Sequence, residues 1–169
     1  ASTIAELDIA IAAGTASGSA PSGLIDQRDR LVTELTSFAD ATVNYDSNGQ
    51  VSVSIDGHLL VGQGQARTIQ LSVVTDPALA PLGYDRYVVT NGSGRELDLS
   101  SGKLSGELVG INELVPQYRR ELDTLAGSIV TSTNALHQSG TALDGSTGVS
   151  LFDPSALTAT DIRMSADVA

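Results

Sequence analysis

The sequence predicts an α+β fold, in which an elongated bundle of long helices carries an inserted small antiparallel β domain. Two changes of pattern along the chain predict it. Apolar residues recur every three or four positions up to residue 40, alternate with polar residues between residues 41 and 99, and return to helical spacing from residue 104. Of the 169 residues, 41% are apolar but only 4% are aromatic, so the core is expected to be thin and aliphatic.

Residues 1–40 are predicted to form a helical hairpin of the bundle. The first helix is indicated by one apolar stripe, Ile4, Leu7 and Ile11. The Gly- and Ser-rich residues 14–23 are typical of a loop. A second stripe follows, with Arg28 as its one polar position; its apolar members are Leu24, Leu31, Leu35 and Phe38. Two short helices joined by such a loop can pack antiparallel.

Residues 41–100 are predicted to form the inserted antiparallel β domain. Alternating apolar residues flank Asn48-Gly49, and Asn-Gly in this setting favours a tight hairpin. Asp56-Gly57 predicts a second turn. Further strands are expected over residues 59–61, 68–74 and 84–90, the last two separated by a proline-containing loop.

The clearest element is a long helix predicted within residues 101–140. Its apolar residues step by four and three positions into one seam, which suits either coiled-coil association or the packing of a domain core. The seam consists of Leu104, Leu108, Ile111, Val115, Tyr118, Leu122, Leu125, Ile129 and Leu136. Pro116 lacks a backbone N–H, so we expect a kink or a locally opened turn there, and Gly140 is expected to end the helix.

Residues 141–169 are predicted to be a loop-rich C-terminal segment. Ile162, Met164 and Val168 indicate a terminal strand that needs a partner. Residues 144–148 (DGSTG) have some character of a calcium loop, but they lack successive Asp or Asn ligands and a final Glu. An ordinary Asp-Gly turn is therefore the preferred interpretation, and no metal ligands are assigned.

Composition argues against several classes of function. The chain has no Cys and two His, which leaves no thiolate site and little basis for a histidine-rich metal centre. Its 20 acidic and 9 basic residues give a net charge of −11, which disfavours nucleic acid and acidic membranes as partners. Gly62-Gln63-Gly64 lacks the third glycine of a dinucleotide fingerprint, so no cofactor is assigned.

One pair of residues has the spacing of a catalytic dyad. Ser100 and Lys103 fit an S-x-x-K pattern, in which the lysine would activate the serine, but the companion motifs are missing. The same residues are a natural approach to the long helix. We therefore predict no catalytic residue and no enzymatic activity, while a small enzyme built on this pair stays as an alternative.

Three blocks of sequence resemble one family. Residues 24–35 (LIDQRDRLVTEL), residues 101–108 (SGKLSGEL) and residues 134–140 (NALHQSG) occur in the same order as related blocks in the bacterial flagellar hook-associated protein 1 family, the first hook-filament junction proteins. LDGSTGVSLF (143–152) extends the third block. The resemblance covers the chain from about Ile4 to Phe152 and implies a central or outer fragment without the terminal helices.

The resemblance also implies a function and a location. It implies a non-catalytic axial protein of the bacterial flagellum, exported by the flagellar type III pathway without a cleaved signal peptide, that joins hook to filament outside the cell. Its implied partners are further copies of itself in a ring, the hook protein, the second junction protein, and a secretion chaperone bound through an absent C-terminal segment. The alternatives are another axial protein, namely flagellin or the second junction protein, and a surface carbohydrate-binding module.

Two sets of residues are predicted to matter for this role. The structural seam residues expected to hold the helices together are Leu31, Leu35, Leu108, Ile111, Tyr118, Leu122, Leu125 and Ile129. The family-motif residues are Asp26, Gln27, Arg28, Asp29, Asn134, His137 and Gly140. Arg28 and His137 are expected to pair with carboxylates across the bundle. Leu122→Asp is expected to place an unpaired carboxylate in the seam and to cost several kcal/mol.

Overall fold

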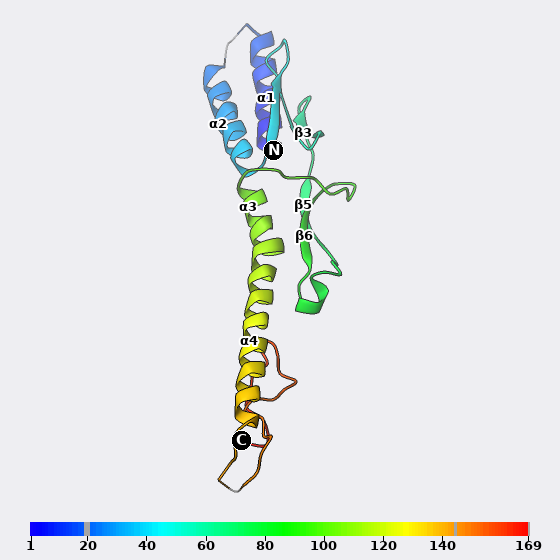
Figure 1. Ribbon diagram of the computed structural model, residues 1–169. Coiled ribbons are helices and arrows are strands. Elements are labelled where there is room, and N and C mark those ends of the chain that lie inside the picture. Colours follow the sequence, from blue (N-terminus) through cyan, green and yellow to red (C-terminus); the bar gives the residue numbers. More distant parts are fainter. Residues whose placement is uncertain (19–20, 144, 169) are drawn as a thin grey trace. The chain divides into compact units, whose positions relative to one another are not determined.

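The computed structural model describes residues 1–18, 21–143 and 145–168. The chain divides into two compact units, Ala1–Glu113 and Leu114–Ala169. The first unit contains a helical hairpin and two small sheets, and the second contains one long helix with an irregular segment beside it (Figure 1). The fold is therefore α+β, as the sequence predicts.

The helical hairpin consists of α1 (Ser2–Ala16) and α2 (Ser22–Phe38), which lie side by side (Figure 1). Both helices are confirmed, but the predicted loop over residues 14–23 is too long. Gly14, Thr15 and Ala16 continue α1, where the Thr15 hydroxyl donates to the Ile11 carbonyl at 2.9 Å. Gly, Ser and Thr are typical of loops, so the composition indicated a loop that begins before α1 ends and continues into α2.

A four-stranded antiparallel sheet follows the hairpin, with strand order β1-β2-β3-β4. Its strands are β1 (Ala41–Tyr45), β2 (Val51–Ile55), β3 (His58–Gly62) and β4 (Gln65–Ala66). The predicted Asn-Gly hairpin is confirmed, since Tyr45 pairs with Val51 across the turn and Gly49 adopts a φ of 77°. The sequence did not predict β4, which is too short to produce an alternating pattern.

A second, two-stranded sheet pairs β5 (Ile69–Val74) with β6 (Arg86–Asn91) in antiparallel register. The proline-containing loop between them includes the 3-10 helix η1 (Ala80–Leu82). Both strands are confirmed. The β residues thus form two separate sheets, because β4 and β5 do not pair with each other.

The core of the first unit lies between the helical hairpin and the four-stranded sheet. Strand β2 alternates between fully and partly buried side chains, and its buried members face the helices. The core cluster is Ile4, Ala5, Val32, Ala39, Val51, Val53, Ile55, Leu60 and Val61. The absence of aromatic side chains from it agrees with the composition.

Helical conformation extends through α3 (Lys103–Val109), the π-helix η2 (Gly110–Leu114) and α4 (Val115–Gln138). The locally opened turn expected near Pro116 is confirmed, because η2 is a wider turn that ends just before that proline. Gly140 follows the helix, but its φ is not in the left-handed region. A Cβ at this position would lie 3.3 Å from the His137 carbonyl oxygen, so close approach explains the glycine better than cap geometry does.

After α4 the chain returns along the same helix without regular secondary structure (Figure 1). The prediction of a terminal strand around Met164 is wrong for the described residues. Met164 forms only a single antiparallel bridge, with Phe152. Asp144, the first residue of the DGSTG turn, lies outside the described residues. None of the helices in the described part of the chain combines the length and apolar character needed to cross a membrane.

Candidate functional site

A buried ion pair joins the two helices of the hairpin. Arg28 Nη1 of α2 lies 3.0 Å from Asp8 Oδ1 of α1, and their side chains are only 5% and 1% exposed. The second carboxylate oxygen of Asp8 accepts a hydrogen bond from the Val51 backbone N–H at 2.8 Å. Arg28 Nη1 also donates to the Gly49 carbonyl at 2.7 Å. The expected carboxylate partner of Arg28 is thus confirmed and is Asp8. Both residues of the pair also bind backbone groups at the β1–β2 turn.

Two further groups surround the Arg28 guanidinium. Asp29 forms a second ion pair with it at 2.9 Å, and the Tyr45 ring centroid lies 5.1 Å from it. Burial would lower the pKa of Arg28, but hydrogen bonds from its guanidinium to Asp8 and Asp29 outweigh that and raise it. The other two residues of this motif, Asp26 and Gln27, are exposed.

The predicted seam residues fall into groups with different surroundings. Leu31 and Leu35 pack against the core cluster of the first unit. Leu108 and Ile111 line an apolar groove beside β5 and β6 with a volume of about 490 Å³. The four seam residues of α4 are exposed by 59%, 53%, 57% and 43%, namely Tyr118, Leu122, Leu125 and Ile129.

The surroundings of Leu122 change what its substitution should do. Because more than half of this side chain is exposed, Leu122→Asp buries no charge in this chain by itself. The cost of several kcal/mol expected for a buried seam therefore does not apply here. A role of these residues in holding helices together requires a helix outside the described structure.

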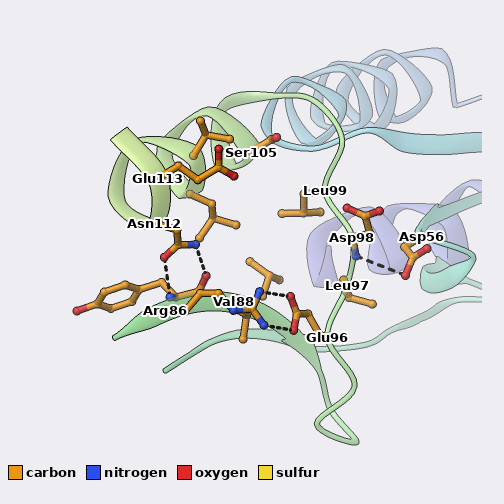
Figure 2. Close-up of a pocket in the computed structure, with 14 residues that line it drawn as sticks. Asp56, Arg86, Val88, Glu96, Leu97, Asp98, Leu99, Ser105, Asn112 and Glu113 are labelled. Carbon is orange, nitrogen blue, oxygen red and sulfur yellow. Dashed lines mark hydrogen bonds and ion pairs between the residues drawn. The ribbon is translucent and has the colours of Figure 1, made fainter. Parts of the chain in front are cut away.

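A polar groove of about 440 Å³ lies within the first unit, between β6 and the α3–η2 segment (Figure 2). At its edge the Asn112 amide donates to the Tyr87 carbonyl and accepts from the Tyr87 N–H, both at 2.8 Å. Arg86 forms two hydrogen bonds of 2.8 Å with Glu96, and these lower the pKa of Glu96. Asn112, Arg86 and Glu96 thus hold β6 in place, whereas Asp56 on the other side of the groove pairs with Arg95.

In the second unit, side chains of α4 bind the backbone of the strap, our name for residues 149–165. Asn134, which is 6% exposed, donates to the Phe152 carbonyl at 2.9 Å and accepts from its N–H at 2.8 Å. His137 Nδ1 lies 2.7 Å from the Val149 carbonyl. The expectation of a carboxylate partner for His137 is therefore wrong, because a main-chain carbonyl occupies that position.

Side chains of α4 also hold the strap further along its length. Asp123 accepts from the Ala159 N–H at 2.8 Å, and Arg119 donates to the Thr160 hydroxyl at 2.7 Å. Beneath the strap, Ala126 and Val130 of α4 are buried. This stripe was not predicted from the sequence, because the apolar seam beside it is more regular.

The patterns considered for catalysis have structural roles. The Ser100 hydroxyl donates to the Asp40 carboxylate, and Lys103 Nζ lies 4.9 Å from the Phe38 ring centroid. Neither group is therefore oriented toward the other. Gly62-Gln63-Gly64 connects β3 to β4, and a Cβ on Gly64 would lie 2.8 Å from the Ile9 side chain.

Asp8 and Asn112 are the site residues that sequence reasoning overlooked. Asp8 lies four residues after Ile4 and three before Ile11, within the apolar stripe of α1. A carboxylate on a buried stripe requires a cationic or N–H partner, so that position could have identified it. Asn112 had no comparable pattern around it.

Comparisons with known proteins agree with this arrangement. Residues 1–152 match the family model described as the flagellar hook-associated protein FlgK helical domain. The chain is 32% identical over 143 residues to flagellar hook-associated protein 1 of Salmonella typhimurium and 30% identical to that of Escherichia coli K12. In both cases the match covers 82% of this chain and 26% of the relative, so the chain spans about a quarter of their length.

A solved structure shows the same fold. The flagellar hook junction protein FlgK from Burkholderia pseudomallei superposes with a TM-score of 0.66 at 30% identity, over 90% of this chain and 28% of that one. These relatives are structural flagellar proteins, so neither the Ser100 pattern nor any other dyad needs a catalytic explanation. The family model matches 152 of the 169 residues of this chain, and the chain therefore belongs to the flagellar hook-associated protein FlgK family.

Proposed function

We propose that this chain is the helical part of a non-catalytic protein that joins hook to filament in the bacterial flagellum, outside the cell. The match of residues 1–152 to the FlgK helical domain carries this proposal. The proposed partners are further copies of the same protein in a ring, the hook protein and the second junction protein. A secretion chaperone is proposed to bind the longer protein before export.

The exposed seam of α4 is the proposed packing surface of this assembly. Four large side chains, Tyr118, Leu122, Leu125 and Ile129, are each more than two-fifths exposed and follow helical spacing. A contiguous apolar surface of this kind is typical of protein interfaces. The relatives are more than three times as long as this chain, since the 143 matched residues cover 26% of their length. We propose that a helix of the longer protein covers this seam and that the resulting bundle supports the junction.

Electron microscopy of flagella tests the proposal. Full-length protein carrying Leu122→Asp and Ile129→Asp should fail to join hook to filament in cells that lack the native protein. Thr124→Asp with Thr131→Asp is the matched control, because it adds the same two charges, seven residues apart, at exposed polar positions of the same helix. Normal filaments with the double variant would rule out the seam as a packing surface, and normal filaments without any form of the protein would rule out the junction role.

A further inference from the structure

The buried Asp8–Arg28 pair contacts the backbone at the β1–β2 turn and the start of β2. β3 does not pair with this part of β2. β3 pairs with β2 from Val53 onward, so the N–H of Val51 lies beyond the end of that ladder. Asp8 supplies the acceptor that the missing strand residue would have provided, at 2.8 Å. An unpaired N–H at this site would be costly, because Val51 is 1% exposed.

The other member of the pair complements a second backbone group of the same turn. Arg28 donates to the Gly49 carbonyl at 2.7 Å, while its guanidinium keeps the ion pair with Asp8. The pair therefore presents one acceptor and one donor, spaced to meet Val51 and Gly49. An adjacent strand presents the same alternation of acceptor and donor.

We propose that the Asp8–Arg28 pair is a docking lock that selects how the β1–β2 hairpin is seated on the α1–α2 hairpin. A one-residue slip of β2 would expose its buried side chains and leave both charges without their backbone partners. Buried ion pairs often contribute little net stability compared with apolar residues of similar size. The role of this pair is therefore to exclude other seatings rather than to strengthen the fold.

Hydrogen exchange of the 169-residue chain, measured by NMR, tests the lock. Asp8→Ala leaves Arg28 without its buried partner and should lower the melting temperature. The double variant Asp8→Leu/Arg28→Met should recover most of that loss, yet protection of the Val51 amide should fall at least tenfold while that of Val61 stays unchanged. Arg86→Met/Glu96→Leu is the matched control, because it removes an exposed ion pair and should leave Val51 protected.

Two results would overturn the proposal. One is full protection of the Val51 amide in the double apolar variant, since packing alone would then select the seating. The other is an unchanged melting temperature in Asp8→Ala. If the double variant does not fold, Asp8→Asn decides the question: it keeps the side-chain shape but replaces one of the two acceptor oxygens by an NH2 donor. With the remaining oxygen facing Arg28, the Val51 N–H has no acceptor, and its protection should again fall at least tenfold. Unchanged protection in Asp8→Asn would equally reject the lock.

Discussion

Asn134 binds both backbone polar groups of Phe152, so a single side chain of α4 imitates one rung of an antiparallel sheet. Asn112 makes the same pair of bonds with Tyr87 in the other unit. In both places an irregular or edge segment has backbone groups that no strand satisfies. A helical asparagine satisfies them, because its amide carries one donor group and one acceptor.

Asn134→Ala should destabilise the chain by about 2 kcal/mol, since it removes two hydrogen bonds and leaves the Phe152 N–H and carbonyl without partners. Urea unfolding measures this loss, and hydrogen exchange should show faster exchange at Phe152 and Ala159. Gln117→Ala is the control, because the bond of its side chain is to exposed Glu121 on the same helix. Equal stability of the two variants would contradict the role given to Asn134.

Gly102→Ala should cost about 3 kcal/mol or more. Gly102 has φ 92° and ψ 177°, a conformation open essentially only to glycine, and a Cβ there would lie 2.7 Å from the Phe38 carbonyl. Gly106→Ala is the matched control within α3, where a Cβ has open space around it. It should stabilise the chain by about 0.5–1 kcal/mol. Thermal unfolding of both variants should therefore show shifts of opposite sign.

The strap should weaken in strong acid. Hydrogen bonds from the Ser155 hydroxyl and N–H, together with Arg163, lower the pKa of Asp153 from 3.8 to about 2. Because the folded pKa is depressed, the stability that Asp153 contributes is complete above pH 3.8 and is lost as the pH falls through about 2. An NMR titration of its carboxyl group should report this pKa. In Ser155→Ala it should rise toward 3.8, and an unmoved value would show that Ser155 is not the cause.

Val130→Asp and Leu122→Asp should have very different effects in this chain. Val130 is 1% exposed beneath the strap, so a carboxylate there should cost about 4 kcal/mol. Leu122 is 53% exposed, and its substitution should cost about 1 kcal/mol or less. Chemical unfolding of the 169-residue chain measures both. A large cost for Leu122→Asp would mean that the seam is already covered by another part of this chain.

The sequence predicted the regular elements well, because their residues obey a period. The spacing of Ile4 and Ile11 identified α1, and the Asn48-Gly49 turn identified the first hairpin. Pro116 correctly marked an opened turn, since the missing N–H is a local property of one residue. Where an element is defined by local chemistry, the sequence was sufficient.

The site was harder to predict, because its contacts join residues far apart in the chain. Asp8 and Val51 are separated by 43 positions, and no local pattern connects them. His137 was assigned a carboxylate partner because charge is visible in a sequence, whereas the Val149 carbonyl that it contacts is a group every residue carries. The division of apolar seam residues between covered and exposed faces also depends on tertiary packing.

The strap described above is held through its main chain at Phe152, Val149 and Ala159. Contacts of this kind do not depend on which side chain the bound residue carries. The strap should therefore tolerate most replacements at these three positions, whereas Asn134 and Asp123 of α4 should tolerate few. At these contacts the constraint thus falls on the helical side chains, whereas the three strap residues that they bind are free to vary.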